Sequence, residues 1–427
     1  MGKYIRRHVD AQLKTYLDTF GAVVIEGPKW CGKTTTAASL AASQISIANP
    51  SGQFQNRRFA ETDPALALDG ARPRLVDEWQ EVPMLWDAVR FACDEAHGAP
   101  GQFILTGSSI PRPKGRADGW GEPMHSGAGR IGRLRMSTLT LAERGLSSGA
   151  VSLAALMAGK PCSAPPSTGS LAGYADAICH GGWPANVDMS VTQSMLTARG
   201  YLDAVANADV SRVDGVRRDP EKVSLVIASL ARNESTLATN KTLLADVGGR
   251  GVADSTMRDY LDVLRRVFLI QDVPAWNPAL RSPVKIRAAA KHHFADVSLA
   301  AAALGATPQT LLGDLKTMGL LFESLVLHDL IAYAQTFGAR VAHYRDDSDL
   351  EVDAIVAGAD GSWGAFEIKL GADQENAAAA SLNALERKMV ARGERSPAVK
   401  AVVVGVGAFG YVRQDGVRVV PFDALGA

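Results

Sequence analysis

One run of residues near the N-terminus constrains the fold more than any other stretch of the chain. The run is Gly27, Pro28, Lys29, Trp30, Cys31, Gly32, Lys33 and Thr34. It fits the spacing G-x-x-x-x-G-K-[ST], follows an apolar stretch at 22–26 that reads as a strand, and precedes a predicted helix over 34–42. A strand, such a loop and a helix in succession aim backbone N–H groups at a phosphate. The alternative, a strand-to-helix turn without a ligand, does not explain a complete match in this context.

The loop pattern also predicts roles for particular side chains. Lys33 would reach the β- and γ-phosphates of ATP, and the Thr34 hydroxyl would bind Mg²⁺. We predict nucleotide contacts from the loop and the residues that follow it, namely Gly27, Pro28, Lys29, Trp30, Cys31, Gly32, Lys33, Thr34 and Thr35.

An acidic pair downstream fits the same chemistry. Residues 74–78 form an apolar run that ends in Asp77 and Glu78. This ending is common by itself, but at this distance after a phosphate-binding loop it indicates a Walker B strand. Asp77 would hold Mg²⁺. Glu78 would polarise the attacking water, because a general base must lie within hydrogen-bond reach of its proton. Residues 84–96 then read as a helix.

A further buried strand is predicted at 102–109, ending in small polar residues. We choose Ser108 over Ser109 as the residue that orients the hydrolytic water near the γ-phosphate. Such a sensor is expected where a strand lies between the P-loop and Walker B strands. The alternative is an ordinary strand-to-loop turn.

Two arginines lie at the end of a stretch at 110–133 that is rich in Gly, Pro and Arg and is predicted to be mobile. Arg130 or Arg133 could act as a finger on transition-state charge, in cis or across the boundary of a homo-oligomer. The competing interpretation is a surface arginine that pairs with Asp or Glu.

Composition limits the remaining possibilities. The 427 residues suggest about two to four domains. The formal net charge of +0 means that nucleic-acid binding would need local patches. The 4 cysteines show no paired metal spacing and read as reduced thiols of a cytoplasmic protein. We find no apolar run of the roughly 18 residues that span a bilayer and no signal-peptide pattern, so we expect no membrane partner.

The middle of the chain is predicted to be helical. An N-terminal helix over 3–20 carries Arg6, Arg7 and His8, which we interpret as a solvated face. Residues 147–170 read as a Ser/Pro/Gly-rich loop or linker, and helical patterns fill 171–215. Helices at 221–232, 240–247 and 254–266, followed by a strand at 267–273, have the order of a winged helix that places a helix in DNA. The basic residues that could contact phosphates are Arg258, Arg265, Arg266, Arg281, Lys285, Arg287 and Lys291. The alternative is a helical packing module with solvated arginines.

The C-terminal region contains a second constellation. Its predicted elements are a helix at 316–337, strands at 339–345, 350–356 and 363–370, a helix at 373–392 and a strand at 398–405. Its candidate residues are Glu323, Asp353, Glu367 and Lys369. The order and the residues resemble the αβββαβ core of PD-(D/E)xK nucleases. That resemblance implies a second Mg²⁺ or Mn²⁺ bound by Glu323, Asp353 and Glu367, with Lys369 steadying the scissile phosphate.

Strand geometry bears on this constellation independently of the resemblance. If the hairpin turns about Asp360, Asp353 lies opposite Glu367, and Glu351 lies opposite Lys369. Like charges directly opposite are destabilising, and a divalent metal between them would remove that penalty. The alternative is a solvated acidic loop beside a chance Glu-x-Lys strand.

The motifs taken together resemble a known family. Gly-Pro-Lys-x-x-Gly-Lys-Thr-Thr, Val-Asp-Glu-x-Gln-x-Val-Pro, Ile-Leu-Thr-Gly-Ser-Ser and Gly-Arg-Ile…Leu-Thr-Leu-Ala-Glu occur in this order. The order is similar to that of prokaryotic AAA-like ATPases that carry a C-terminal domain of unknown function. Gly-Gly-Trp-Pro at 181–184 and the turn at 294–300 extend the likeness. Lys29-Trp30-Cys31 departs from the family, which more often has Arg-Gln and a small residue there.

We therefore predict an α/β chain in four parts: an AAA-like P-loop NTPase domain with a parallel sheet flanked by helices at 1–165, a helical connection at 166–220, a winged-helix-like domain at 221–295, and a restriction-endonuclease-like domain at 296–427. One function that fits is an ATP-driven enzyme in which the ATP state controls a nuclease acting on DNA. The other is an ATP-switched scaffold or regulator whose C-terminal domains bind a protein or DNA partner without cleavage.

Overall fold

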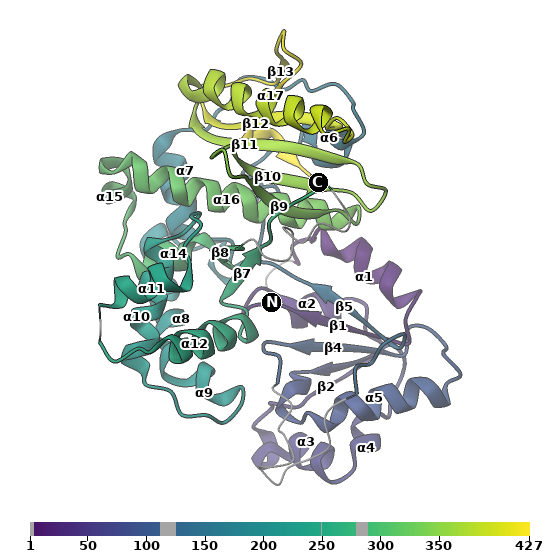
Figure 1. Cartoon of the computed structure of the whole chain (residues 1–427). Coiled ribbons are helices and arrows are strands. Elements are labelled where there is room, and N and C mark those ends of the chain that lie inside the picture. Colours follow the sequence, from purple (N-terminus) through teal and green to yellow (C-terminus); the bar gives the residue numbers. More distant parts are fainter. Residues whose placement is uncertain (1–3, 112–124, 249, 279–288) are drawn as a thin grey trace. The chain divides into compact units, whose positions relative to one another are not determined.

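The computed structural model describes residues 4–111, 125–248, 250–278 and 289–427 (Figure 1). Its contacts divide the chain into two compact units. Unit 1 comprises Met1–Thr138, Ala204–Asp219 and Leu261–Leu269, whereas unit 2 comprises Leu139–Asp203, Pro220–Tyr260 and Ile270–Ala427. The predictions for Arg281, Lys285 and Arg287, and for part of the 110–133 stretch, lie outside the described residues.

A five-stranded parallel sheet forms the centre of unit 1, in the order β2-β3-β4-β1-β5. The strands are β1 (Ala22–Glu26), β2 (Ser43–Ser46), β3 (Arg74–Asp77), β4 (Phe103–Gly107) and β5 (Ile131–Arg135). The central strands are apolar runs, as expected for parallel strands that are covered on both faces. β4 lies between β1 and β3, which confirms the expected strand between the P-loop and Walker B strands.

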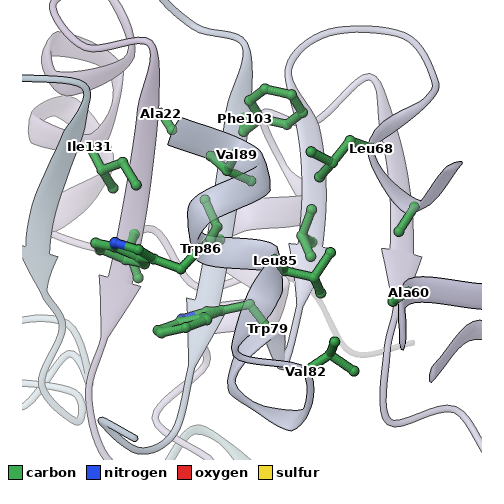
Figure 2. Close-up of a cluster of buried hydrophobic side chains, with 14 of the residues drawn as sticks. Ala22, Ala60, Leu68, Trp79, Val82, Leu85, Trp86, Val89, Phe103 and Ile131 are labelled. Atoms are coloured by element: carbon green, nitrogen blue, oxygen red, sulfur yellow. The ribbon is translucent and has the colours of Figure 1, made fainter. Parts of the chain in front are cut away.

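Helices cover both faces of this sheet. They are α1 (Val9–Leu17), α2 (Lys33–Ala38), α3 (Ser51–Thr62), α4 (Pro64–Leu68) and α5 (Met84–Glu95), with the 3-10 turn η1 (Trp79–Glu81). Unit 1 also contains the π-helical turn η4 (Val205–Asp209) and the short helix α9 (Val210–Arg212). Side chains alternate across a strand. Val24 therefore joins Trp86 of α5 in one core (Figure 2), and Val23 joins Leu13 of α1 in the other. The N-terminal helix begins at Val9, later than predicted.

A six-stranded mixed sheet forms the C-terminal part of unit 2, in the order β13-β14-β12-β11-β10-β9. Its strands are β9 (Arg340–Arg345), β10 (Glu351–Ala357), β11 (Trp363–Gly371), β12 (Val399–Val406), β13 (Tyr411–Val412) and β14 (Arg418–Pro421). Helices α16 (Leu315–Thr336) and α17 (Glu375–Ala391) lie on opposite faces of it (Figure 1). The predicted helix, three strands, helix and strand are confirmed. Their order alone does not show a nuclease, so that interpretation stays a prediction.

The hairpin of β10 and β11 has the register that the sequence predicts. Ala354 pairs with Phe366, and Ala357 pairs with Trp363. Asp353 and Glu367, the two carboxylates expected to face each other, lie just beyond these pairs, and both contact Lys369 Nζ.

Residues 147–170 are a loop that contains two short elements and packs within unit 2, so the loop alternative holds and the linker alternative is corrected. They contain β6 (Val151–Ser152) and α6 (Leu153–Met157), and β6 pairs in parallel with β15 (Leu425–Gly426). The Ser147 hydroxyl donates a 2.6 Å hydrogen bond to the Leu425 carbonyl. Composition misled here because the Ser, Pro and Gly residues form the turns between short elements whose apolar residues are buried.

The helices of the middle region match the prediction closely. α10 (Pro220–Arg232), α11 (Asn240–Val247) and α12 (Asp254–Arg266) precede the antiparallel pair β7 (Ile270–Val273) and β8 (Lys291–Phe294). The other helices are α7 (Leu171–His180), α8 (Val191–Ala204), α14 (Val297–Ala303) and α15 (Pro308–Gly313), with short 3-10 turns at Pro184–Asn186, Ala372–Gln374 and Phe422–Ala424. β7 starts later than predicted because the backbone turns at Phe268, where φ is 56°. The winged-helix assignment stays a prediction.

Helix α16 is long and apolar enough to cross a membrane by length and composition, so the expectation that no such run exists was wrong. Among the described residues it is the one helix that passes this test. Its side chains Met318, Phe322 and Leu330 are buried within unit 2. This burial fits a core helix, which has the same composition for a different reason.

Candidate functional site

The phosphate-loop motif connects β1 to α2 in unit 1, and its two glycines are sterically required. A Cβ on Gly27 would lie 2.1 Å from the Met136 carbonyl oxygen. Gly32 has φ of 101°, a left-handed conformation that favours glycine. The glycines therefore fix the path of the loop.

Lys33 is buried at the centre of this loop. The residue is only 4% exposed, and its ammonium donates to the carbonyls of Gly27 at 2.9 Å and Pro28 at 2.7 Å. The loop thus holds the ammonium in place with its own backbone. The neighbouring Cys31 is fully buried, whereas the exposed Thr35 lies on the first turn of α2.

Arg7 braces the loop from outside, which corrects its interpretation as part of a solvated face. The residue is 8% exposed, and its guanidinium donates to the Cys31 carbonyl at 2.8 Å. It also donates to the carbonyls of Ser137 at 2.8 Å and Thr138 at 3.1 Å, beyond β5. A charged donor shared among three carbonyls couples the loop to the end of the sheet.

The two residues predicted to hold Mg²⁺ meet at the carboxyl ends of the strands. The Thr34 hydroxyl donates a 2.7 Å hydrogen bond to Asp77 Oδ1. Thr106, the second-last residue of β4, donates to the same oxygen at 2.6 Å. Hydroxyl and carboxylate oxygens are the donors that Mg²⁺ prefers, so this pair fits the ion.

Glu78 is held by two polar side chains. Ser108 donates to Glu78 Oε2 at 2.9 Å, and Gln80 donates to the same oxygen and to Ser108 Oγ. The Glu78 backbone is left-handed, with φ of 57°, and its N–H donates to Thr106 Oγ1 at 3.3 Å. A non-glycine residue in this conformation is uncommon and tends to occur at functional sites.

Two residues of the site, Thr106 and Gln80, were not predicted from the sequence. A polar residue in the otherwise apolar run of β4 was one available signal, because a buried hydroxyl needs a partner. Gln80 stands two residues after Glu78, within the Asp-Glu-x-Gln motif that was already noted. The choice of Ser108 over Ser109 gains support from its contact with Glu78.

Both candidate arginine fingers pair with carboxylates of unit 1. Arg130 lies 2.8 Å from Asp94, and this pairing lowers the pKa of the Asp94 carboxyl. Arg133 pairs with Glu26 and stacks over the Trp86 ring at 4.7 Å. These contacts match the surface ion-pair interpretation. The finger role stays a prediction for both residues.

The remaining loop residues include an unusual pair. Lys29 lies 2.5 Å from Asp209 of η4, and Trp30 is 64% exposed with φ of 65°. Asp209 was not singled out in the sequence, because nothing in its neighbourhood points to a loop 180 residues away.

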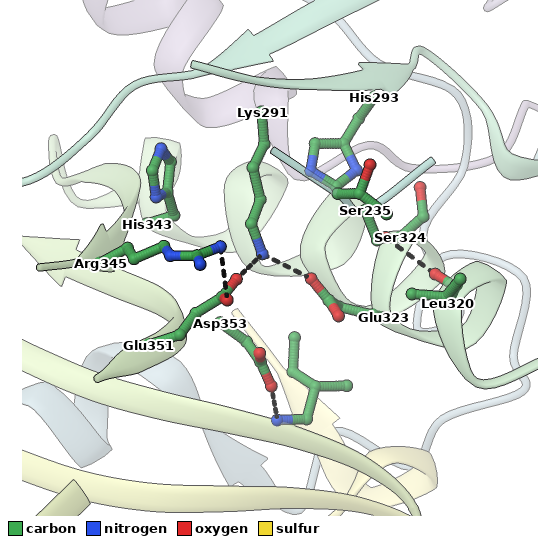
Figure 3. Close-up of polar contacts among 12 residues, drawn as sticks. Ser235, Lys291, His293, Leu320, Glu323, Ser324, His343, Arg345, Glu351 and Asp353 are labelled. Carbon is green, nitrogen blue, oxygen red and sulfur yellow. Dashed lines mark hydrogen bonds and ion pairs between the residues drawn. The ribbon is translucent and has the colours of Figure 1, made fainter. Parts of the chain in front are cut away.

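A second polar cluster lies in unit 2, around the C-terminal constellation (Figure 3). Lys369 Nζ is 3.0 Å from Asp353 and 2.6 Å from Glu367. Asp353 also accepts a 2.8 Å hydrogen bond from the Ile368 backbone N–H. The lysine ammonium therefore pairs with both carboxylates and offsets part of their negative charge.

Glu323 is paired with a different lysine. Lys291 of β8 is 1% exposed, and its ammonium lies 3.3 Å from Glu323 and 2.8 Å from Glu351 (Figure 3). Its predicted contact with a phosphate at the surface is wrong, because the side chain is buried in this cluster.

The pKa values in the cluster reflect burial and proximity. Burial raises the pKa of Glu323 and of Glu367, and the nearby Asp353 raises both further. Burial opposes the charged form of Lys369, but Asp353 and Glu367 outweigh it and raise its pKa. The pKa of Lys291 is likewise raised, because Glu323 and Glu351 outweigh its burial.

The three acidic residues are not gathered into a metal-binding group. Within the described ranges, no set of three or more His, Cys, Asp or Glu side chains is arranged to hold a metal ion. Glu323 instead pairs with Lys291, and Asp353 and Glu367 pair with Lys369. In this pairing the described residues show no second Mg²⁺ or Mn²⁺ site, so that site stays a prediction.

The other motifs of the family resemblance meet inside unit 2. Gly182 N–H donates to Asp296 at 2.8 Å, and Trp183 Nε1 donates to Ser298 at 3.1 Å. A Cβ on Gly182 would lie 2.2 Å from the Leu139 carbonyl oxygen. These motifs therefore have a structural explanation, because Gly182 and Trp183 of one motif donate hydrogen bonds to the turn at 294–300 of the other.

Comparisons with family models agree with the geometry of the first site. Residues 19–144 match the model described as an AAA domain. Residues 171–310 and 318–425 match two models described as domains of unknown function, DUF8612 and DUF4143. The chain therefore carries an AAA-like P-loop ATPase domain, which implies ATP and usually Mg²⁺. The expected C-terminal domain of unknown function is also present.

Two mycobacterial proteins are similar over most of the chain. Uncharacterised proteins of Mycobacterium bovis and Mycobacterium tuberculosis are each 26% identical over 369 residues, which are 85% of this chain and 74% of theirs. Among solved structures, a Walker-type ATPase of Pyrococcus abyssi has a TM-score of 0.40 at 12% identity, covering 70% of this chain and 96% of its own. A single-residue variant of RuvB from Thermotoga maritima has a TM-score of 0.26 at 18% identity. The match covers 62% of this chain and 89% of the RuvB chain.

Proposed function

We propose that the chain is a Mg²⁺-dependent ATPase whose nucleotide state controls a nucleic-acid-directed C-terminal domain. The observation that carries the ATPase part is the contact between Thr34 and Asp77 at 2.7 Å, beside the Lys33 loop. It supports a metal ligand pair at the end of the sheet where a P-loop would hold phosphates. The AAA-like match of residues 19–144 agrees with this.

The side chains of the site have separate proposed roles in binding phosphate, holding Mg²⁺ and activating water. Lys33 would bind the β- and γ-phosphates after exchanging its bonds to the loop carbonyls. Thr34 and Asp77 would hold Mg²⁺, which neutralises phosphate charge when bound. Glu78 would accept a proton from, or orient, the attacking water. Ser108 and Gln80 keep the Glu78 carboxylate in position through their hydrogen bonds.

Control of the C-terminal domain is the second part of the proposal. The support is the order of elements from α16 to β12 and the facing of Asp353 and Glu367 in the hairpin. DNA is the substrate class that this resemblance suggests. Arg258 and Arg266 on α12 pair with Asp254 and Asp262 of the same helix, so the arginines available for phosphates there are partly neutralised.

One observation favours the scaffold or regulator as a second candidate. Lys369 and Lys291 already pair with the carboxylates that cleavage would require. A cluster neutralised in this way can stabilise a binding domain without performing chemistry. The partner would then be a protein or a DNA that is bound and not cut.

The experiment that separates the two measures cleavage of linear, supercoiled and single-stranded DNA with Mg²⁺ or Mn²⁺, with and without ATP. The wild-type chain is compared with Lys369→Ala and Lys33→Ala. Cutting that is lost in Lys369→Ala and depends on Lys33 supports the ATP-controlled nuclease. Intact DNA in the presence of a folded, ATP-hydrolysing wild type supports the scaffold.

A further inference from the structure

The phosphate loop contains a second lysine, Lys29, whose ammonium pairs with a carboxylate that is distant in the sequence. Lys29 Nζ lies 2.5 Å from Asp209 Oδ1, and 180 residues separate the two in sequence. The Lys29 side chain is 40% exposed, whereas that of Asp209 is 9% exposed. The pair therefore joins a reachable ammonium to a nearly buried carboxylate.

Lys29 lies in the part of the loop that would enclose the phosphates of a bound nucleotide. It directly follows Gly27 and Pro28, whose carbonyls accept hydrogen bonds from Lys33. The next residue, Trp30, is left-handed with φ of 65°. A lysine is a compact charge on a flexible stem of four carbons, so its ammonium can exchange one anionic partner for another without movement of the backbone. Phosphate bound in this loop would be such a partner.

Asp209 lies in a segment suited to respond. It ends η4, a π-helical turn, and such turns are rare and frequently occur at functional sites. Among the described residues, Lys29 is the side chain that pairs with the Asp209 carboxylate. A buried carboxylate that loses its cation is costly, so the turn is expected to rearrange when Lys29 leaves.

We infer that the nucleotide phosphates and Asp209 compete for Lys29. In the nucleotide-free chain, Asp209 holds the lysine and weakens nucleotide binding. With nucleotide bound, Lys29 contacts phosphate and Asp209 is released. The inference rests on the proposed function, because it requires a nucleotide in the loop, and it adds a phosphate-contacting residue to that site.

The inference also identifies a segment that senses occupancy of the loop. Ala204–Asp219 belongs to unit 1, yet along the chain it connects α8 to α10. Release of Asp209 would therefore act on the segment that leads directly into the helical region. In the proposed control by ATP, the first change would therefore occur in the segment Ala204–Asp219.

The test measures binding of ATP and ADP, each with Mg²⁺, to the full chain by calorimetry. Asp209→Asn is expected to tighten ATP binding about three- to tenfold, because the competing charge is gone. Lys29→Gln is expected to weaken ATP binding about tenfold and ADP binding less, since ATP carries more phosphate charge. The double variant should bind ATP as Lys29→Gln does. Asp254→Asn removes the same charge from an exposed ion pair with Arg258 and serves as the matched control.

Hydrogen exchange of the Val205–Asp209 backbone supplies a second measurement. ATP should speed exchange there in the wild type and have little effect in Asp209→Asn. Unchanged or weaker ATP binding in Asp209→Asn would overturn the inference while leaving the ATPase proposal intact. Failure of the wild-type chain to bind ATP at all would overturn both.

Discussion

The Thr34 hydroxyl donates a 2.7 Å hydrogen bond to Asp77, joining the end of the phosphate loop to the end of β3. Thr106 donates to the same carboxylate oxygen at 2.6 Å. Two hydroxyls, one from the first turn of α2 and one from β4, thus hold one carboxylate at the end of β3. This relationship is the structural basis for treating the end of the unit 1 sheet as a metal and nucleotide site.

Replacing Asp77 by Ala should reduce ATP turnover about 100-fold or more, because the ligand for Mg²⁺ is lost and phosphate charge is left uncompensated. Steady-state hydrolysis measured across a Mg²⁺ titration checks this. Thr62→Ala, an exposed change on α3, is the control. Turnover within a few-fold of wild type at all Mg²⁺ concentrations would contradict the assigned role.

Replacing Gly27 by Ala should destabilise unit 1, because the added Cβ would lie 2.1 Å from the Met136 carbonyl oxygen. We expect a cost of about 1–3 kcal/mol or more, as for other forced overpacking. Gly319→Ala is the matched control. No neighbouring atom lies within 4 Å of its added Cβ, and Ala is favoured in a helix by about 1 kcal/mol. Chemical denaturation should therefore move the two variants in opposite directions, and equal shifts would count against the packing argument.

Replacing Lys291 by Met should destabilise unit 2, because Glu323 and Glu351 lose their buried cation. Breaking a buried pair from one side costs about 3–5 kcal/mol. Adding Glu323→Gln should recover part of the loss, because less uncompensated charge remains. Lys316→Met at an exposed position of α16 is the control. Urea unfolding that barely distinguishes the two single variants would show that the cluster contributes little.

Lowering the pH from about 6.5 to 4 should weaken unit 2 through His343. Burial lowers the pKa of His343 to about 4; its hydrogen bond to the Ala289 carbonyl acts in the opposite direction, and Lys291 adds to the lowering. The unfolded chain binds a proton at higher pH than the folded chain does, so this stability is present above about pH 6.5 and is lost as the pH falls.

The contribution of His343 should reach about 3 kcal/mol at most, from the difference between the two pKa values. Free energies of unfolding measured at several pH values should therefore fall less steeply in His343→Gln than in the wild type. The exposed His97, changed to Asn, should leave the slope as it is. A slope that is identical in the wild type and His343→Gln would refute the assignment.

The parts that the sequence predicts well depend on local patterns. The loop around Lys33, the strand ending in Asp77 and the hairpin that faces Asp353 with Glu367 each follow from spacing over a few residues. Strand alternation placed Glu367 and Lys369 on one face, and the assumed turn about Asp360 set the hairpin register. The helices at 220–266 follow from apolar periodicity in the same way.

The parts that it missed depend on contacts between distant residues. Arg7 and Lys291 were interpreted as solvent-facing or phosphate-contacting charges, and Asp209 was not singled out, but all three are buried and paired. A charged side chain gives no local sign of burial, because the partner that makes burial possible lies elsewhere in the chain. Composition failed at residues 147–170 for a related reason, since the pairing of β6 with β15 joins segments far apart in sequence.

The central claim is that the Lys33 loop and Glu78 hydrolyse ATP. The most direct measurement is steady-state ATP hydrolysis by the purified full chain with Mg²⁺, for the wild type, Lys33→Ala and Glu78→Gln. We predict measurable turnover by the wild type, loss of nucleotide binding and turnover in Lys33→Ala, and retained binding with at least about 100-fold slower turnover in Glu78→Gln. Equal turnover in all three proteins would contradict the account.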